Sequence, residues 1–219
     1  MLIRDKYVPR SIDEFVFETD DMMHTINDYV AVAAQCNPGH LLLVGRVGTA
    51  KSTLAKLIAQ AVFAPSYDLD VSSFSGFDFD NPQHVRKSIK NAITFASISA
   101  TYRMVVIDEI DAMTSASQGV LASMMDHHQK NCVFILTGND IGSIDERIIS
   151  RCRTVRFVHA DERRWLRRAK QIMTSEKVVI SDDGLLALLA TAHGDIRQML
   201  RIIQDKITIE RSKISSPAT

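Results

Sequence analysis

Long hydrophobic runs are missing from this sequence. No apolar stretch approaches the ~20 residues that a membrane-spanning helix needs. The N-terminal segment, MLIRDKYVPR, lacks the apolar core of a signal peptide. We therefore expect a soluble, intracellular protein that has no membrane partner.

Cysteine is scarce as well. The chain of 219 residues has three cysteines, Cys36, Cys132 and Cys152, which are odd in number and widely spaced. This pattern predicts neither a disulfide framework nor a zinc site, and it fits the reducing cytoplasm best.

The chain also has no excess charge of one sign, because 26 Lys and Arg residues balance 26 Asp and Glu residues. No overall field draws it to nucleic acid or to a membrane, so any binding to a polyanion requires a local basic patch. Internal repeats and low-complexity linkers are absent from the sequence too. The length allows one large domain, or one medium and one small domain.

Short apolar runs alternate with stretches of helical periodicity in the first part of the chain. Runs that are apolar throughout and separated by helices are typical of a parallel sheet covered on both faces. We predict an α/β domain at residues 1–159, with a five-stranded parallel sheet flanked by helices. The predicted strands are Leu41–Val44, Tyr67–Val71, Met104–Ile107, Cys132–Leu136 and Thr154–Val158. The predicted helices are Lys51–Phe63, Pro82–Ser99 and Ser115–Gln129.

After His159 the pattern becomes helical throughout. We predict a small helical lid domain at residues 160–212 and a flexible tail at 213–219. The predicted lid helices are Asp161–Glu176, Asp182–Ala192 and Asp195–Arg211.

Residues 45–52, GRVGTAKS, follow the first predicted strand and open the next helix. A loop in this place points backbone N–H groups and a helix N-terminus at phosphates, and its two glycines permit the tight turn. Lys51 would reach the β- and γ-phosphates, and the Ser52 hydroxyl would ligate Mg²⁺. The usual pattern, G-x-x-x-x-G-K-[ST], has Gly where this chain has Ala50. We predict a phosphate loop for a nucleoside triphosphate.

A second, independent signal is RMVVIDE at 103–109, an apolar strand that ends in two carboxylates. Asp108 would lie beside the phosphate loop and hold Mg²⁺, and Glu109 would polarise the attacking water. Asn139, after the fourth predicted strand, would orient that water or contact the γ-phosphate. Alone, an Asp-Glu pair after a core strand is commonly a surface pair, and an Asn in a turn after a strand is usually a turn former. Together and in this order, the motifs predict hydrolysis of the triphosphate.

With these motifs in place, the chain resembles the AAA+ ATPases, and among them the clamp-loader ATPase subunits. It is most similar to the small subunits of replication factor C and to the large subunit of T4-type phage clamp loaders. The resemblance extends from about Lys6 to about Gln204. It is carried by KYVPRSIDEF at 6–15, NPGHLLLVG at 37–45, IDEIDAMT at 107–114 followed by Gln118, Leu121 and Met125, SRC at 150–152 and GDIR at 194–197.

The resemblance implies roles that the residues alone do not. Arg151 would be an arginine finger that reaches the γ-phosphate bound by a neighbouring subunit, so a homo- or hetero-oligomer would share its ATP sites. Arg197 would contact the nucleotide from the lid, although an arginine on a helix is equally a partner of a nearby acid. The implied catalytic residues are Lys51, Glu109, Asn139, Arg151 and Arg197, and the implied Mg²⁺ ligands are Ser52 and Asp108. The implied nucleotide contacts are Tyr7, Val8, Ile12, Gly45, Arg46, Val47, Gly48, Thr49, Ala50, Lys51, Ser52, Thr53 and Arg197.

The same resemblance implies that the subunits surround primer–template DNA and load a sliding clamp. Arg86, Lys87 and Lys90 are the candidates for contacts with DNA phosphates, which would follow the backbone without reading sequence. A basic run on one helix is equally a solvated face. Met113 and Thr114, with nearby apolar residues, would face the clamp.

Besides Ala50, the chain departs from the family pattern in two further respects. The helix after Met113 carries VLASMMD where replication factor C subunits tend to have adjacent arginines, and no collar domain follows the lid. A truncated chain and a compact relative, such as a phage protein in the host cytoplasm, both fit. Other AAA+ roles therefore stay open: a helicase loader, a branch-migration motor, a MoxR-like chaperone, or an assembly subunit that uses nucleotide as a switch and hydrolyses little.

Overall fold

The computed structural model describes residues 2–64 and 66–215, which form two compact units. The first, the sheet unit, consists of Asp20–Arg46 and Lys51–Phe157. The second, the helical unit, consists of 2–19, Val47–Ala50 and 158–215 among the described residues.

The sheet unit contains a five-stranded parallel sheet in the order β2-β3-β4-β1-β5. Its three central strands are almost entirely buried, which explains why they read as continuous apolar runs and do not alternate. The predicted five-stranded parallel sheet is confirmed. The strands are β1 His40–Gly45, β2 Val71–Ser75, β3 Arg103–Asp108, β4 Cys132–Gly138 and β5 Cys152–Phe157.

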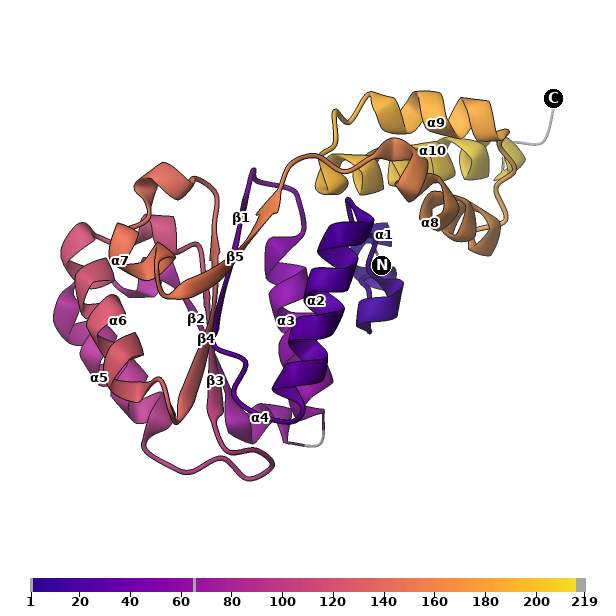
Figure 1. Ribbon diagram of the computed structural model, residues 1–219. Coiled ribbons are helices and arrows are strands. Elements are labelled where there is room, and N and C mark those ends of the chain that lie inside the picture. The colour runs from indigo at the N-terminus through magenta and orange to yellow at the C-terminus, as the bar shows by residue number, and fades with distance from the viewer. Residues whose placement is uncertain (1, 65, 216–219) are drawn as a thin grey trace. The chain divides into compact units, whose positions relative to one another are not determined.

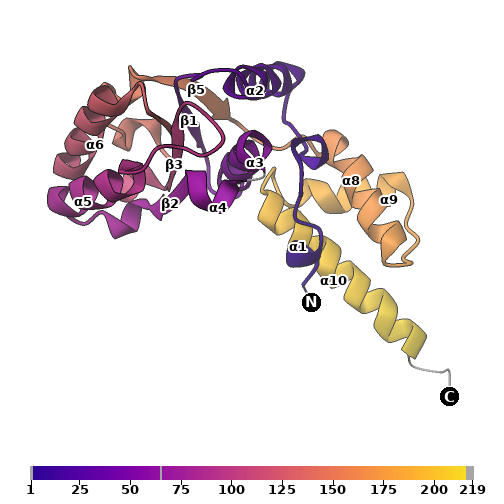
Figure 2. The ribbon, with the colours of Figure 1, turned by 90° about the horizontal axis from the view of Figure 1, so that it is seen from below.

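Helices cover both faces of this sheet. Figures 1 and 2 show α2 and α3 on one face, and α5 and α6 on the other. Val85 and Ile89 of α5 and Leu121 of α6 are buried in one apolar cluster with strand residues. The helices of the unit are α2 Asp20–Ala33, α3 Lys51–Phe63, α4 Tyr67–Asp70, α5 Pro82–Ile93, α6 Ser115–His128 and α7 Glu146–Ile149.

The helical unit has its own apolar core, built around Trp165, Leu189 and Met199. The N-terminal segment is fixed to this core by Glu176, whose buried carboxylate accepts hydrogen bonds from Lys6 Nζ and the Tyr7 hydroxyl, both at 2.6 Å. These hydrogen bonds hold the pKa of Glu176 below its usual range. The helices are α1 Ile3–Lys6, α8 Glu162–Ser175, α9 Asp182–Ala190 and α10 Ile196–Ser215. The last residues of the predicted tail, 216–219, lie outside the described residues.

Two predictions about secondary structure are wrong. Tyr67–Val71 is not a strand, since Tyr67–Asp70 forms the short helix α4 and the strand begins at Val71. The helical turn brings the buried Asp70 carboxylate back to the Ser66 hydroxyl, at 2.6 Å, which an extended chain would prevent. Helix α5 ends at Ile93 and not at Ser99, because Ile98 N and Ser99 N donate to Asp70.

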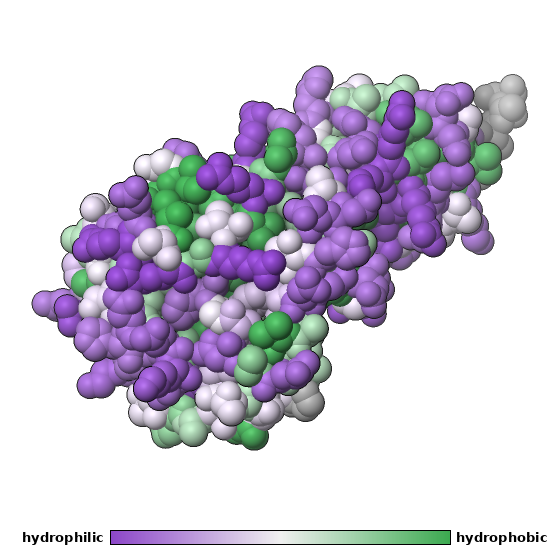
Figure 3. Space-filling view, viewed as in Figure 1, coloured by the Kyte–Doolittle hydropathy of each residue, from purple (hydrophilic) through white to green (hydrophobic). Residues whose placement is uncertain are grey.

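None of the described helices is both long and apolar enough to cross a membrane. The face of the molecule in Figure 3 is mostly hydrophilic, and its hydrophobic residues lie in small separate areas. Single exposed apolar residues of this kind are normal on a protein surface.

Candidate active site

Three adjacent strands of the sheet unit end at the same edge, because all strands are parallel. The strands β3, β4 and β1 are neighbours, and they end at Asp108, Gly138 and Gly45. Helix α3 begins at Lys51, shortly after β1. The topology thus gathers the predicted residues of three motifs at the carboxyl edge of the sheet, where α/β proteins commonly bind their ligands.

Asp108 and Ser52 are in direct contact. The Ser52 hydroxyl donates to Asp108 Oδ1 at 2.7 Å, and the Thr137 hydroxyl donates to the same oxygen. Hydroxyl and carboxylate oxygens are the hard ligands that Mg²⁺ prefers, and Mg²⁺ is usually held by one or two carboxylates together with phosphate oxygens. The residues present therefore fit the predicted Mg²⁺ site.

Lys51 is 6% exposed, and its charge is held at the end of β1. Its Nζ donates to the carbonyl oxygens of Gly45 at 2.6 Å and Arg46 at 2.8 Å, and to Asn139 Oδ1 at 3.2 Å. A buried ammonium requires such partners, because leaving it without them costs several kcal/mol. The cation is thus fixed at the edge where phosphates would lie.

Asn139 connects Lys51 to the carboxylate of Asp111, a residue to which the sequence motifs assign no role. Asp111 Oδ1 accepts from Asn139 N at 3.1 Å, and Asp111 Oδ2 accepts from Asn139 Nδ2 at 3.3 Å. A carboxylate on one side and an ammonium on the other determine which amide atom is oxygen and which is nitrogen. Asn139 is therefore held by the protein, as a residue that orients water or phosphate should be.

Glu109 has a backbone conformation that is rare outside glycine. Its φ is 57°, and its N–H donates to Thr137 Oγ1 at 3.0 Å. Gly76 packs against the Glu109 carbonyl so closely that a side chain at Gly76 would overlap it. Within the described part of the chain, no group donates a hydrogen bond to the Glu109 carboxylate. Strain of this kind commonly marks functional positions, where the surrounding structure holds a reactive group in place.

The loop between β1 and α3 explains the one irregular residue of the phosphate-loop motif. Ala50 has φ 63°, in the left-handed region that favours glycine, and this is the position where the usual motif has glycine. Gly48 has φ 89°, and within the helical unit its carbonyl accepts from Ile196 N at 3.0 Å. Thr49 is buried, whereas Arg46 and Val47 are exposed. The alanine thus adopts the backbone conformation that favours glycine at this position, which strains it.

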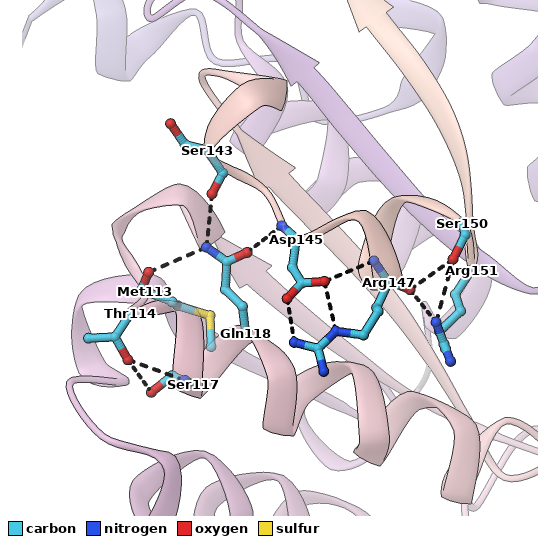
Figure 4. Close-up of polar contacts among 9 residues, drawn as sticks. All are labelled: Met113, Thr114, Ser117, Gln118, Ser143, Asp145, Arg147, Ser150 and Arg151. Carbon is cyan, nitrogen blue, oxygen red and sulfur yellow. Dashed lines mark hydrogen bonds and ion pairs between the residues drawn. The ribbon is translucent and has the colours of Figure 1, made fainter.

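Arg151 lies between α7 and β5, and it is away from the cluster around Lys51. Its Nε and Nη2 donate to the two carboxylate oxygens of Asp126, at 2.6 and 2.7 Å. Its Nη1 donates to the Arg147 carbonyl and lies 3.5 Å from Ser150 Oγ (Figure 4). The hydrogen bond from Arg151 holds the pKa of Asp126 below its usual range.

The turn that carries Arg151 is fixed to α6 by one buried amide (Figure 4). Gln118 Nε2 donates to the carbonyls of Met113 at 3.3 Å and Ser143 at 3.0 Å, and Gln118 Oε1 accepts from Asp145 N at 2.7 Å. Asp145 in turn caps α7 and pairs with Arg147. Arg151 therefore extends from a rigid support.

The remaining predicted contacts are not brought to the Lys51 cluster by any described interaction, so their roles stay predictions. In the helical unit, Tyr7 is half-buried through its bond to Glu176, Ile12 is half-buried in a short turn, and Val8 and Arg197 are exposed. In the sheet unit, Thr53 lies in the first turn of α3. The predicted DNA contacts Arg86, Lys87 and Lys90 are all exposed on α5.

Sequence reasoning missed Thr137, Asp111 and Asp126 as parts of the site. Thr137 and Asp111 stand beside recognised motifs, two residues before Asn139 and three after Asp108, so their closeness to these motifs was a usable signal. Asp126 is 25 residues before Arg151, and nothing local in the sequence indicates the pair.

A known family and several known proteins match this chain. The family model described as "ATPase family associated with various cellular activities (AAA)" matches residues 41–160. The chain is 31% identical to replication factor C subunit 5 of Arabidopsis thaliana over 95% of its own length and 58% of that protein's. It is 32% identical to the replication factor C small subunit of Archaeoglobus fulgidus over 94% of its own length and 63% of that protein's. The chain thus spans about three fifths of these curated relatives.

Among solved structures, the RuvB Holliday junction branch migration motor of Thermotoga maritima has a similar fold. The TM-score is 0.76 at 19% identity, over 94% of this chain and 67% of that one. An identity this low supports the fold alone.

Proposed function

Because the chain belongs to the AAA ATPase family, we propose that it binds and hydrolyses ATP with Mg²⁺, as a subunit of an oligomeric clamp loader. ADP and phosphate would be the products. The observation that carries the proposal is the cluster at the carboxyl edge of the sheet. There the buried Lys51 ammonium, the Ser52–Asp108 pair and the constrained Asn139 meet.

Each residue of this cluster has a definite task in the proposal. Lys51 would exchange its backbone carbonyl partners for the β- and γ-phosphates. Ser52 and Asp108 would hold Mg²⁺, whose charge would offset that of the phosphates. Glu109, whose carboxylate is not engaged by the described residues, accepts the proton of the attacking water. Asn139 orients this water or a γ-phosphate oxygen.

The proposed reaction also requires a second subunit. Arg151 belongs to the sheet unit but makes no described contact with Lys51, Ser52 or Asp108; its partners are Asp126, Arg147 and Ser150. A guanidinium that is needed at a γ-phosphate but absent from its own site fits an arginine finger acting on a neighbouring subunit. We therefore propose a homo- or hetero-oligomer with shared ATP sites.

The clamp-loading role rests on the curated relatives, which are named as replication factor C subunits. The proposed partners are a sliding clamp and primer–template DNA. Arg86, Lys87 and Lys90 give α5 an exposed basic face that suits a DNA backbone.

The test is the ATPase rate of the assembled protein, measured alone, with primer–template DNA, with the sliding clamp of the same replication system, and with both. We expect the highest rate with both partners. The DNA effect should weaken steeply as salt rises, because phosphate contacts release counterions. If neither partner changes a measurable ATPase rate, the clamp-loader assignment fails while the ATPase assignment stands.

A branch-migration motor, one of the AAA+ roles that the sequence leaves open, is the second candidate; the fold shared with RuvB is compatible with it and does not choose between the two roles. The same assay separates the two, because a branch-migration motor should respond to four-way junction DNA and not to a sliding clamp. Absence of turnover, with ATP still bound, would instead favour a nucleotide switch.

A further inference from the structure

The ion pair between Arg151 and Asp126 is unusually complete for an exposed pair. Both carboxylate oxygens are engaged, at 2.6 and 2.7 Å, by two different nitrogens of one guanidinium. Yet the side chains are 31% and 52% exposed. Exposed ion pairs usually contribute little to stability, although bidentate arginine–carboxylate pairs are among the stronger ones; what such a pair fixes is the orientation of the guanidinium.

The contact uses one particular edge of the guanidinium. A guanidinium can hold two oxygens at once along the edge formed by Nε and Nη2, or along the terminal edge formed by Nη1 and Nη2. Asp126 occupies the first edge. The Arg147 carbonyl and Ser150 Oγ both accept from Nη1, but the contact with Ser150 is long at 3.5 Å. Among the described residues none accepts the second Nη2 hydrogen, so the terminal edge keeps one open N–H donor on Nη2, and on Nη1 only a weak contact with Ser150 would have to give way to another anion.

The carboxylate that holds this edge is itself fixed. Asp126 lies in the last turns of α6, next to the fully buried Met125. Arg151 follows α7, which Gln118 attaches to α6. Both members of the pair thus extend from elements that are held relative to each other, so the guanidinium plane has a defined direction.

We propose that Asp126 is a positioning residue for Arg151: it fixes the guanidinium so that the terminal edge is presented to the nucleotide bound by a neighbouring subunit. This inference rests on the proposed function of Arg151. Without Asp126, the long arginine side chain would sample several rotamers, and few of them would align two N–H groups with phosphate oxygens.

The experiment measures turnover and KM for ATP in the full assembled complex with saturating partners. Asp126→Ala should lower kcat roughly tenfold, by analogy with the outer residues that orient metal ligands, and leave KM unchanged. Asp126→Asn keeps the shape and one acceptor oxygen, so it should recover part of the loss. Asp182→Ala is the matched control, because it removes another exposed carboxylate of an ion pair, at 2.8 Å from Lys170, and should keep wild-type turnover.

The decisive variant combines two substitutions. In an Arg151→Ala background, Asp126→Ala should cause no further loss, since a positioning residue acts only through the residue it positions. If Arg151→Ala itself has no effect, the proposed finger is wrong. If Arg151→Ala lowers kcat but neither Asp126 variant does, only the present inference fails. A higher kcat in Asp126→Ala would also overturn it, because Asp126 would then compete with the phosphate for Arg151.

Discussion

The two edges of the sheet each hold an aspartate among hydroxyl groups, and the surroundings of the two aspartates differ. At the amino edge, just before β2, Asp70 is completely buried and accepts from the hydroxyls of Ser66 and Ser99 and from two backbone N–H groups. At the carboxyl edge, Asp108 is half-buried, and its Oδ1 accepts from two hydroxyls. Among the described residues, none donates to Asp108 Oδ2.

The comparison separates a carboxylate that the chain itself satisfies from one that keeps acceptor capacity, as the proposed Mg²⁺ ligand should. Four donors inside the chain satisfy Asp70, so its charge needs nothing further. Asp108 keeps acceptor capacity at an open edge, beside a buried cation and a strained glutamate. The amino edge is complete by itself, whereas the carboxyl edge is arranged for a ligand.

The largest expected effect is at the carboxyl edge. Glu109→Gln should lower ATP turnover by about 100-fold or more, since it removes the group that accepts the proton of the attacking water. Affinity for ATP, measured by fluorescence titration, should stay within about threefold, because no described contact links this carboxylate to the Lys51 cluster.

Asp111→Asn is the informative comparison, since it keeps the side-chain shape around Asn139 but removes the charge. It should retain more turnover than Glu109→Gln. A Glu109→Gln protein with wild-type turnover would show that another group accepts the proton. The carboxyl edge would then not differ from the amino edge in the way proposed for Glu109.

The amino edge should affect stability and not catalysis. Asp70→Ala leaves two hydroxyls and two N–H groups without their acceptor, which should cost about 3 kcal/mol in the free energy of unfolding. Urea unfolding at pH 7 measures it, and ATP affinity should be unchanged. Asp108→Asn should instead affect catalysis and not stability. Its free energy of unfolding should change by less than about 1 kcal/mol, and its Mg²⁺-dependent turnover should be lost.

The contribution of the Asp70 carboxylate to stability should depend on pH in one direction. Burial alone would raise the pKa of Asp70, but the bonds from Ser66, Ile98 and Ser99 outweigh it and lower the pKa to about 2. The unfolded chain, with a pKa of about 3.9, binds its proton first. The stabilisation, about 2 to 3 kcal/mol, is therefore fully present above about pH 4 and is lost as pH falls toward 2. Asp70→Asn keeps the side-chain shape but cannot ionise. The difference in free energy of unfolding between wild type and Asp70→Asn should therefore narrow as pH falls over that range. A difference that stays constant would contradict the lowered pKa of Asp70.

These two edges also show what the sequence could and could not predict. Asp108 and Lys51 were predictable, because each occupies a fixed place in a local motif and parallel strands bring their carboxyl ends together. Asp70 was read as part of a strand, because its partners Ile98 and Ser99 lie almost 30 residues away and carry no local signal. The contact between Asp126 and Arg151 was not predicted for the same reason, because the two residues are 25 positions apart. Local chemistry is readable from a motif, but contacts that depend on tertiary structure are not.

The smallest expected effect concerns Ala50. Its φ of 63° costs an alanine about 1 kcal/mol or more relative to glycine, and Ala50→Gly would remove that strain. The substitution also gives the unfolded chain more conformational freedom, and it removes a methyl group packed on the core of the helical unit. Together these two effects destabilise the fold by about as much as the relieved strain stabilises it. The free energy of unfolding should therefore change by less than about 1 kcal/mol, and turnover by less than about threefold.

The matched control for Ala50→Gly is Ala59→Gly, at a buried position inside α3, where φ is helical and no strain is relieved. There the same substitution should cost about 1 kcal/mol or more. Denaturant unfolding of both variants, with turnover measured beside it, separates backbone strain from helix propensity. A tenfold rise in turnover for Ala50→Gly would mean that strain in the loop limits the reaction, and the carboxyl edge would then be less well arranged for its ligand than Lys51, Ser52 and Asp108 indicate.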